Sequence, residues 1–267
     1  VADFESQFAD GLEYHQLAKV YGRMKKSRRN IRRVSSLFLE QINSFHYSNY
    51  NLFVPPVEHT FVSRPNMAYH FKPELFIQLG GGTEFQFYSD KKYLKTGEIC
   101  IMPRGIAHGE QACNDTTTFR NVVICFYNDT ITMHVACANE VLEPKAIKVY
   151  FFKSDLFADC ITILDRVALL KHTELNGSEK AIRGLMTGFF ALMLNVLEAG
   201  SIESSPESHR VNQCQWLIRM HLNDPNLSVT KLADLLNCSP NYLSKLFHQH
   251  TGEKITTYVN RTRLGNA

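Results

Sequence analysis

The sequence predicts an α+β protein in which a central antiparallel β-barrel or sandwich stands between helical segments. Short β-type runs follow one another from Glu58 to about Phe152, and glycine-rich or polar turns separate them, which predicts the β part. Apolar residues at helical spacing predict the helices before and after it. With 267 residues, the chain is long enough for two compact domains, each with its own core.

Residues 1–50 are expected to form an N-terminal helical extension. Apolar residues recur there at roughly helical spacing, among them Leu17, Ile31 and Phe38. The basic run KKSRRNIRR lies within it, at residues 25–33. Because no aromatic side chains interleave with this run to stack on bases, it is more typical of a solvated helix face than of a nucleic-acid site.

Residues 51–153 are expected to form the β domain. Glycine, proline, aspartate and asparagine separate its apolar runs, as turns between strands require. The predicted strands are 60–63, 73–80, 83–88, 98–102, 118–127, 130–136 and 146–152.

Residues 154–200 return to a helical pattern and are expected to form a helical linker, followed by a polar hinge with the sequence GSIESSPES. The second half of the linker carries an apolar seam at heptad spacing, which is typical of a helix that pairs two subunits. A buried face against the β domain explains the seam equally well. The seam consists of Ile182, Leu185, Phe189, Leu192 and Val196.

Residues 206–267 are expected to be all-α and to contain a helix-turn-helix. Ser228 is a cap for the first helix of the pair, and Ser239 followed by Pro240 starts the second. Gly252 is a left-handed stop for the second helix. The outward positions of that helix are polar or basic, namely Asn241, Ser244, Lys245, His248 and Gln249. A polar helix of this kind suits the DNA major groove, although tight helix pairs also occur in other all-helical domains.

The run from Trp216 to Leu264 closely resembles the first half of the DNA-binding domain of AraC/XylS family transcription regulators. The residues that match the family pattern are Ala233, Ser239, Pro240, Leu243, Phe247, Thr251, Gly252, Tyr258, Asn260 and Arg263. The resemblance implies a regulator that binds double-stranded DNA. The family's domain has two helix-turn-helix units joined by a long helix, and here only the first unit and the start of that helix are present. The chain is therefore expected to be C-terminally truncated.

The β domain resembles the cupin-like sensor barrel that this regulator family usually carries. His70, Glu74, Gly80, Gly97, Pro103, Gly105 and His108 follow the order of the two cupin motifs. In metal-binding cupins, a pair of histidines, a glutamate and a late histidine hold a divalent ion, but Ala68 stands here at the first histidine position. His70, Glu74 and His108 would still suffice for iron or manganese.

Two interpretations of these residues compete, because they either bind an ion or hydrogen-bond an effector and tie strands together. The second is favoured for a regulator, so no metal and no other cofactor is expected. The candidate effector site consists of Tyr69, His70, Glu74, Tyr88, Arg104 and His108.

The charge distribution agrees with a DNA-contacting C-terminus. The formal net charge is +3, yet both ends of the chain are basic and the middle carries a net charge of −3. The seven cysteines form no CxxC pair, so reduced and packed thiols are expected. No apolar run approaches the roughly 18 residues of a membrane span, and a cytoplasmic protein without membrane contact is expected.

The sequence thus predicts a transcription regulator that is not an enzyme. Expected partners are double-stranded DNA, a small-molecule effector, a second copy of the chain through the 182–196 seam, and RNA polymerase. Within the helix-turn-helix, Asn241, Ser244 and Lys245 are expected to contact base edges, and His248 and Gln249 to contact phosphates. The alternative is a metal-dependent cupin enzyme of the isomerase or dioxygenase type with an accessory helical domain. A third interpretation is a ligand-binding or dimerising module that makes no useful DNA contact.

Overall fold

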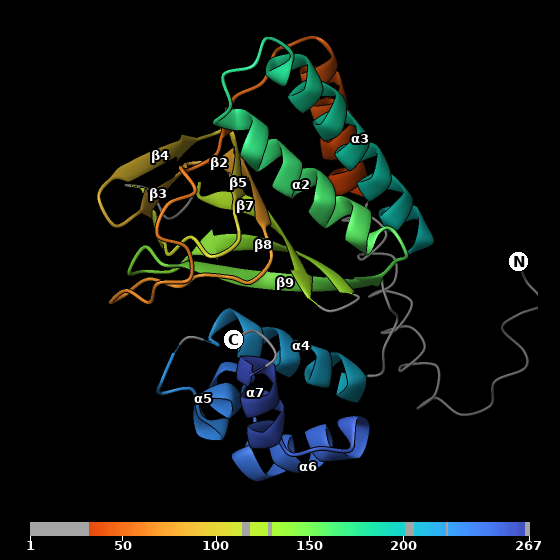
Figure 1. Ribbon diagram of the computed structural model, residues 1–267. Helices are drawn as coiled ribbons and strands as arrows, with labels where there is room; N and C mark the ends of the chain where they lie inside the picture. The colour runs from red at the N-terminus through yellow and green to blue at the C-terminus, as the bar shows by residue number, and fades with distance from the viewer. Residues whose placement is uncertain (1–31, 114–117, 128–129, 201–205, 223, 265–267) are drawn as a thin grey trace, which may run out of the picture.

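A computed structural model of the chain describes residues 32–113, 118–127, 130–200, 206–222 and 224–264 (Figure 1). Residues 32–46 are helical, which agrees with part of the predicted N-terminal extension, whereas its first 31 residues and the hinge at 201–205 lie outside the described residues. The strands are β1 (Leu52–Phe53), β2 (Glu74–Gly80), β3 (Gly82–Gln86), β4 (Lys91–Lys95), β5 (Ile99–Met102), β6 (Gly109–Ala112), β7 (Arg120–Tyr127), β8 (Thr130–Ala138) and β9 (Pro144–Lys153). The helices that follow are α2 (Phe157–Lys171), α3 (Ser178–Ala199), α4 (Pro206–Met220), α5 (Val229–Leu235), α6 (Pro240–Thr251) and α7 (Ile255–Leu264).

The strands form two sheets, with the order β1-β5-β2-β7-β8-β9 in the larger and β4-β3-β6 in the smaller. The described strand pairs are antiparallel, as predicted, except for the parallel pair of β1 with β5. We call residues 52–153 the β domain. Its two-sheet architecture matches the barrel-or-sandwich prediction.

Individual strand predictions were wrong at several places. The run at 60–63 is not a strand, because His59 and Phe61 have positive φ and break the extended conformation. Strands β1, β4 and β6 were not predicted. Strand β4 reads KKYLK, with only Leu94 buried, so its lysines look like turn residues although they line an edge strand.

Alternation along β2 divides its side chains between two cores. Leu75 and Ile77 pack in the core shared with the helices, whereas Phe76 packs in the core shared with the smaller sheet. Because successive side chains point to opposite faces of a sheet, Glu74 shares the inward face with Phe76. A buried carboxylate is therefore placed between the two sheets by strand geometry.

Helices α2 and α3 cover the outer face of the larger sheet (Figure 1), and the N-terminal helix packs against them through Phe38 and Phe45, whose rings contact Phe190. This packing corrects the predicted dimerisation seam at three positions. Ile182, Phe189 and Val196 are buried in the chain's own core, while Leu185 and Leu192 are only partly buried against it. The apolar stripe is used within the chain because α3 needs it to pack against the β domain and α2.

Helix α3 is also long and apolar enough by composition to cross a membrane. Eight of its residues are buried inside the chain, however, including Ile182, Met186 and Phe190. The core helix of a soluble protein passes the same test of length and hydropathy, so α3 is weak evidence for a membrane span.

Helices α4 to α7, which we call the C-terminal domain, have a separate core that includes Ile218, Leu232, Leu243, Phe247 and Tyr258. This domain lies on the opposite side of the sheets from α2 and α3, with α4 nearest to β9 (Figure 1). The two domains meet through aromatic contacts. The Trp216 ring lies 5.4 Å from the His134 ring, and the His209 ring lies 5.7 Å from the Phe151 ring. Trp216 therefore packs between domains rather than in the core of its own helix bundle.

Acid should weaken the contact between the two domains. Burial lowers the pKa of His134 from 6.5 to about 4, so the folded protein disfavours its charged form. Stability from this group is full above about pH 6.5 and is lost as pH falls to about 4, by roughly 3 kcal/mol in total. We expect the emission of Trp216, the single tryptophan of the chain, to shift to the red over this range.

The control for this pH response is His134→Phe, which keeps an aromatic ring and removes the titrating group. Its Trp216 emission should stay constant between pH 6.5 and 4. If the variant shifts like the unaltered protein, protonation of His134 is not what weakens the contact.

Candidate functional site

The predicted helix-turn-helix is formed by α5 and α6, and its capping follows the sequence. The Ser228 hydroxyl accepts a hydrogen bond from the Lys231 amide at 3.2 Å, and the Ser239 hydroxyl accepts one from the Tyr242 amide at 3.3 Å. Pro240 occupies the first turn of α6, and Gly252 ends it in the left-handed region with φ 76°. The two serines and Pro240 satisfy or avoid unpaired N–H groups at the helix starts, and the Gly252 N–H donates to the His248 carbonyl at the end of α6, so the turn is specified locally.

The outward face of α6 is polar and accessible. Asn241, Lys245, His248 and Gln249 are exposed, and Ser244 is half-buried. Asn241, Lys245 and His248 lie at intervals of four and three residues, so they share one face of the helix. The opposite face is fixed by Leu243, Leu246 and Phe247, which are buried. Leu235 of α5 is 46% exposed and is not part of this buried core.

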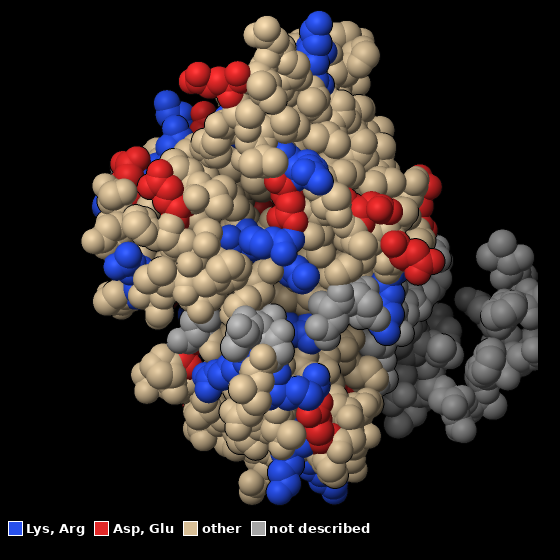
Figure 2. All heavy atoms as spheres, viewed as in Figure 1, with Lys and Arg blue, Asp and Glu red and all other residues tan. Residues whose placement is uncertain are grey.

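Helix α6 lies at the end of the C-terminal domain remote from the β domain (Figure 1). Basic side chains are found at that end of the face drawn in Figure 2, with acidic side chains directly above them. A nucleic acid approaching this end would therefore meet α6 and positive charge, and the β domain would not obstruct it.

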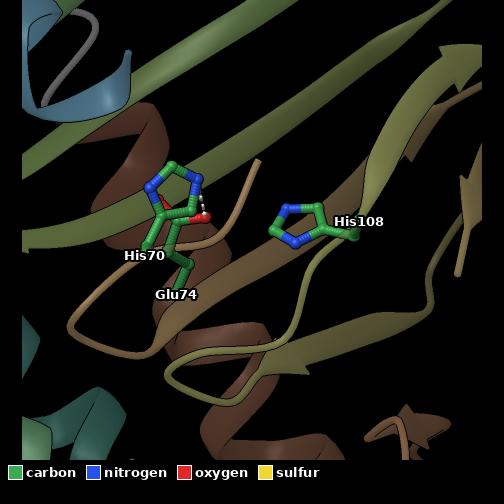
Figure 3. Close-up of side chains that lie close together, drawn as sticks. All are labelled: His70, Glu74 and His108. Atoms are coloured by element: carbon green, nitrogen blue, oxygen red, sulfur yellow. Dashed lines mark ion pairs between the residues drawn. The ribbon is translucent and has the colours of Figure 1, made fainter. Parts of the chain in front are cut away.

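A second candidate site lies inside the β domain, where His70, Glu74 and His108 converge (Figure 3). One ligand atom from each lies within 4.8 Å of the others, and all three side chains are buried. Nε2 of His70 is 3.5 Å from Oε2 of Glu74. The three residues come from the loop before β2, from β2 itself and from the loop before β6.

Backbone hydrogen bonds hold the two histidine segments side by side. Ala68 and His108 form an antiparallel bridge with two N–H to O=C bonds of 2.9 Å, and the Gly105 amide donates to the His70 carbonyl at 2.8 Å. Gly105 has φ +81°, and a Cβ there would lie 2.9 Å from Cβ of Thr60. Only glycine fits this close approach.

Two neighbours hold the ring of His108. Its Nδ1 lies 2.9 Å from the Ile106 carbonyl oxygen, which can only accept, so Nδ1 donates. Its Nε2 lies 3.6 Å from Oε1 of Glu110 on β6, whose charge favours a proton on this nitrogen as well. Glu110 is a nearby acid that the sequence motifs did not indicate.

Burial shapes the charge state of the three residues. It raises the pKa of Glu74 to about 7 and lowers the pKa of His70 to about 3, with smaller contributions to the latter from His108 and His221. At His108 burial acts in the opposite direction, but the hydrogen bond and charge of Glu110 raise its pKa above the ordinary value. His70 is therefore neutral near pH 7, and its lone pair is free to bind a proton donor or a metal.

The donor set fits a divalent metal. Two histidine nitrogens and one carboxylate are the ligands used by iron, manganese and zinc sites. Both carboxylate oxygens of Glu74 are buried without a hydrogen-bond partner of good geometry among the described residues. If an ion binds, His70, Glu74 and His108 would hold it, and the carbonyl of Ile106 would orient His108.

A cavity of about 70 Å³ is shared by the two domains, and of the triad it is His70 and Glu74 that line it. His70, Glu74 and Tyr127 line it from the β domain, and Arg219, Leu222 and Thr262 line it from the C-terminal domain. The sequence did not indicate Tyr127 and Arg219 as site residues, because no motif or spacing within a short stretch connects a residue of β7 with one of α4.

The other predicted effector residues do not line the cavity. Tyr69 packs against Phe61 and Phe71, with ring centroids 5.8 Å and 5.5 Å away. Tyr88 is 64% exposed. Arg104 forms an ion pair with Asp165 of α2 on the outer side. The structure therefore brings together three of the six predicted residues.

Comparison with known proteins decides the class of the C-terminal domain. Residues 218–260 match the model of bacterial regulatory helix-turn-helix proteins of the AraC family. The C-terminal domain is an AraC-family helix-turn-helix domain. The match covers α5 and α6 and the first part of α7, so the AraC-type domain includes the whole face that Asn241, Lys245 and His248 form.

A curated relative matches in the same way. The chain is 52% identical over 69 residues to the uncharacterized transcriptional regulatory protein YesN of Bacillus subtilis (strain 168). This match covers 24% of the chain and only 19% of YesN, so the chain spans about a fifth of the relative's length. The likeness therefore concerns one domain.

Solved structures of AraC-like proteins are also similar in part. The AraC-like transcriptional activator CuxR is 12% identical, with 73% of this chain and 66% of that chain covered and a TM-score of 0.22. Wild-type ToxT from Vibrio cholerae strain SCE256, bound to an unsaturated fatty acid, is 9% identical, with 73% and 88% covered and a TM-score of 0.23. Scores this low carry no argument about how the domains of this chain are arranged.

Proposed function

We propose that the protein is a sequence-specific DNA-binding transcription regulator that is not an enzyme and that responds to an effector bound in the β domain. The observation that carries this proposal is the polar, exposed face of α6 in the AraC-type domain, on a helix that lies remote from the β domain (Figure 1). A helix of this kind enters the major groove of double-stranded DNA, where its side chains meet base edges.

Asn241, Ser244 and Lys245 are assigned to base contacts, because they lie on the first turns of α6. Asparagine pairs well with adenine and lysine with guanine. His248 and Gln249 follow on the next turn and are assigned to phosphates, which supply affinity without sequence information. A regulator of this kind acts in the cytoplasm, next to DNA and RNA polymerase.

Pairing of two copies through α3 stays a prediction, but fewer seam residues are available for it than the sequence suggested. Leu185 and Leu192 are the seam residues that keep some exposure on α3. A regulator that reads two half-sites one helical turn apart would gain from such pairing. The effector site is assigned to His70, Glu74 and His108.

A selection of preferred sites from random double-stranded DNA tests the proposal. At two salt concentrations, we expect the same recovered motif, with affinity that falls as salt rises because phosphate contacts release counterions. Lys245→Ala serves as the matched variant and should recover a less defined motif. Recovery of no motif from the unaltered protein, with binding that disappears in salt, would contradict sequence-specific recognition.

The second candidate function is a metal-dependent cupin enzyme, which the convergence of His70, Glu74 and His108 favours. The size of the cavity counts against it. A volume of about 70 Å³ is far below the roughly 300–1,000 Å³ of sites that enclose organic ligands. Turnover of an organic substrate by metal-loaded protein, lost in Glu74→Gln, would support the enzyme instead.

A further inference from the structure

The cavity beside the metal-type triad is closed by the C-terminal domain. Arg219 and Leu222, from the end of α4 and the turn after it, and Thr262 of α7 form one wall. His70, Glu74 and Tyr127 form the facing wall. An occupant of this cavity therefore touches the β domain and the DNA-binding domain at the same time.

The buried side chains on the β-domain side of the cavity favour a cation as its occupant. Glu74 is 2% exposed, and neither of its carboxylate oxygens has a hydrogen-bond partner among the described residues. A carboxylate only accepts hydrogen bonds, so burial leaves it in need of a donor or a positive ion. One candidate ligand atom from each of His70, Glu74 and His108 lies within 4.8 Å of the others (Figure 3). A cavity of about 70 Å³ admits an ion with a few waters.

We propose that a divalent transition-metal ion, held by His70, Glu74 and His108, is the effector, and that its uptake weakens the docking of the C-terminal domain on the β domain. This inference rests on the proposed function, because it names the effector of that regulator and the contact through which it acts.

The contact between the C-terminal domain and the β domain is centred on Arg219. Its guanidinium carbon lies 5.7 Å from the centre of the Tyr127 ring in the β domain and 5.5 Å from the centre of the Tyr258 ring in α7. It also donates a hydrogen bond to the Tyr258 hydroxyl, and the Tyr127 hydroxyl donates to the sulfur of neighbouring Met220. Arg219 thus joins the β domain to the helix that follows the recognition helix.

A metal ion would act on this contact through charge. A divalent ion adds two positive charges beside Glu74 and Glu110, and Arg219 lines the cavity that His70 and Glu74 also line. His221, which interacts electrostatically with His70, is a second basic group on that side. The ion would therefore repel the Arg219 guanidinium across the cavity.

The C-terminal wall should respond as a unit. Arg263 of α7 donates hydrogen bonds to the carbonyls of Leu222 at 3.1 Å and Asp224 at 2.9 Å, which ties α7 to the turn after α4. Displacing Arg219 would therefore move α4 and α7 together. Trp216, one turn earlier in α4, lies against His134 of the β domain and reports this movement.

The experiment titrates the chelator-treated 267-residue chain with Co²⁺ and with Zn²⁺. Co²⁺ absorption reports nitrogen and oxygen coordination, calorimetry gives stoichiometry, and Trp216 emission reports domain docking. We expect one ion per chain and a red shift of Trp216 emission that saturates at the same ratio. Glu74→Gln, which preserves the side-chain shape, should lower metal affinity at least tenfold and abolish the shift. The control Glu58→Gln changes an exposed acid of the β domain and should do neither.

Variants of Arg219 separate metal binding from its consequence. Arg219→Gln should still bind one ion but show no metal-dependent emission shift, whereas Arg219→Lys, which keeps the charge, should retain part of it. Arg210→Gln, on the same helix but stacked on Tyr242, is the matched control and should respond like the unaltered protein.

Three outcomes would overturn the inference: the absence of stoichiometric metal, equal metal affinity in Glu74→Gln, or metal binding that leaves Trp216 emission unchanged. None of these measurements uses DNA. Failure to recover a DNA motif would therefore contradict the proposed function alone, and failure of the metal titration would contradict this inference alone.

Discussion

Phe247→Ala is expected to unfold the C-terminal domain while the β domain remains folded. The Phe247 side chain has no exposed surface and packs edge-on against Tyr258, with ring centroids 5.4 Å apart. Truncating a buried phenylalanine costs about 3–5 kcal/mol. A core as small as that of α4 to α7 has little stability to spare, so a loss of this size should largely abolish its folded state.

Hydrogen exchange of the full-length variant measures this effect by segment. Amides of α5, α6 and α7 should lose most of their protection, and those of β2 and β7 should keep it, because the two regions have separate cores. Gln249→Ala, two residues further along α6 and exposed, is the control and should change protection little. Uniform loss of protection in both domains would show instead that the domains fold as one unit.

Lys245→Ala is expected to reduce the preference for the selected DNA site over random DNA by about tenfold or more. A good side-chain contact to a base edge contributes about 1–3 kcal/mol of discrimination, and Lys245 is exposed in the middle of the α6 face. Gln249→Ala should instead weaken specific and random DNA by similar factors, because it is assigned to phosphate. Competitive binding assays with the two DNAs at constant salt measure both quantities.

Lys254→Ala provides the charge-matched control for this experiment. Lys254 is exposed just before α7, outside the recognition helix, so its removal alters net charge without altering the groove-facing side chains. It should lower affinity for both DNAs and leave their ratio unchanged. If Lys245→Ala and Gln249→Ala change the ratio equally, the division into base and phosphate contacts is wrong.

The local sequence was sufficient to predict a helix where residues of the same short segment satisfy the backbone hydrogen bonds at its ends. The caps at Ser228 and Ser239, the proline at position 240 and the left-handed Gly252 define α5 and α6 without help from distant residues. The strands β2, β3, β5, β7, β8 and β9 were predictable for a similar reason, since their β-type runs are separated by turn residues. Strand β4 was not, because lysines on an edge strand resemble those of a turn.

Apolar periodicity alone did not determine which surface a helix packs against. The stripe on α3 has the spacing of a dimer seam, and Ile182, Phe189 and Val196 are nevertheless buried inside the chain. A helix buries its apolar face against whichever surface lies nearest, and that surface comes from residues far away in the sequence. Trp216 illustrates the same point, since its partner His134 is on β8.

The sequence by itself determined the AraC-type helix-turn-helix, its polar recognition face and the candidate status of His70, Glu74 and His108. Each depends on capping, periodicity or motif order within a short stretch. Only the tertiary structure decided that these three side chains converge, that Tyr69, Tyr88 and Arg104 do not line the adjoining cavity, and that Arg219 closes it. The physical reason is that the cavity is bounded by separate segments, around residues 70–74, 125–127, 219–222 and 262, whose proximity results from strand pairing and domain docking.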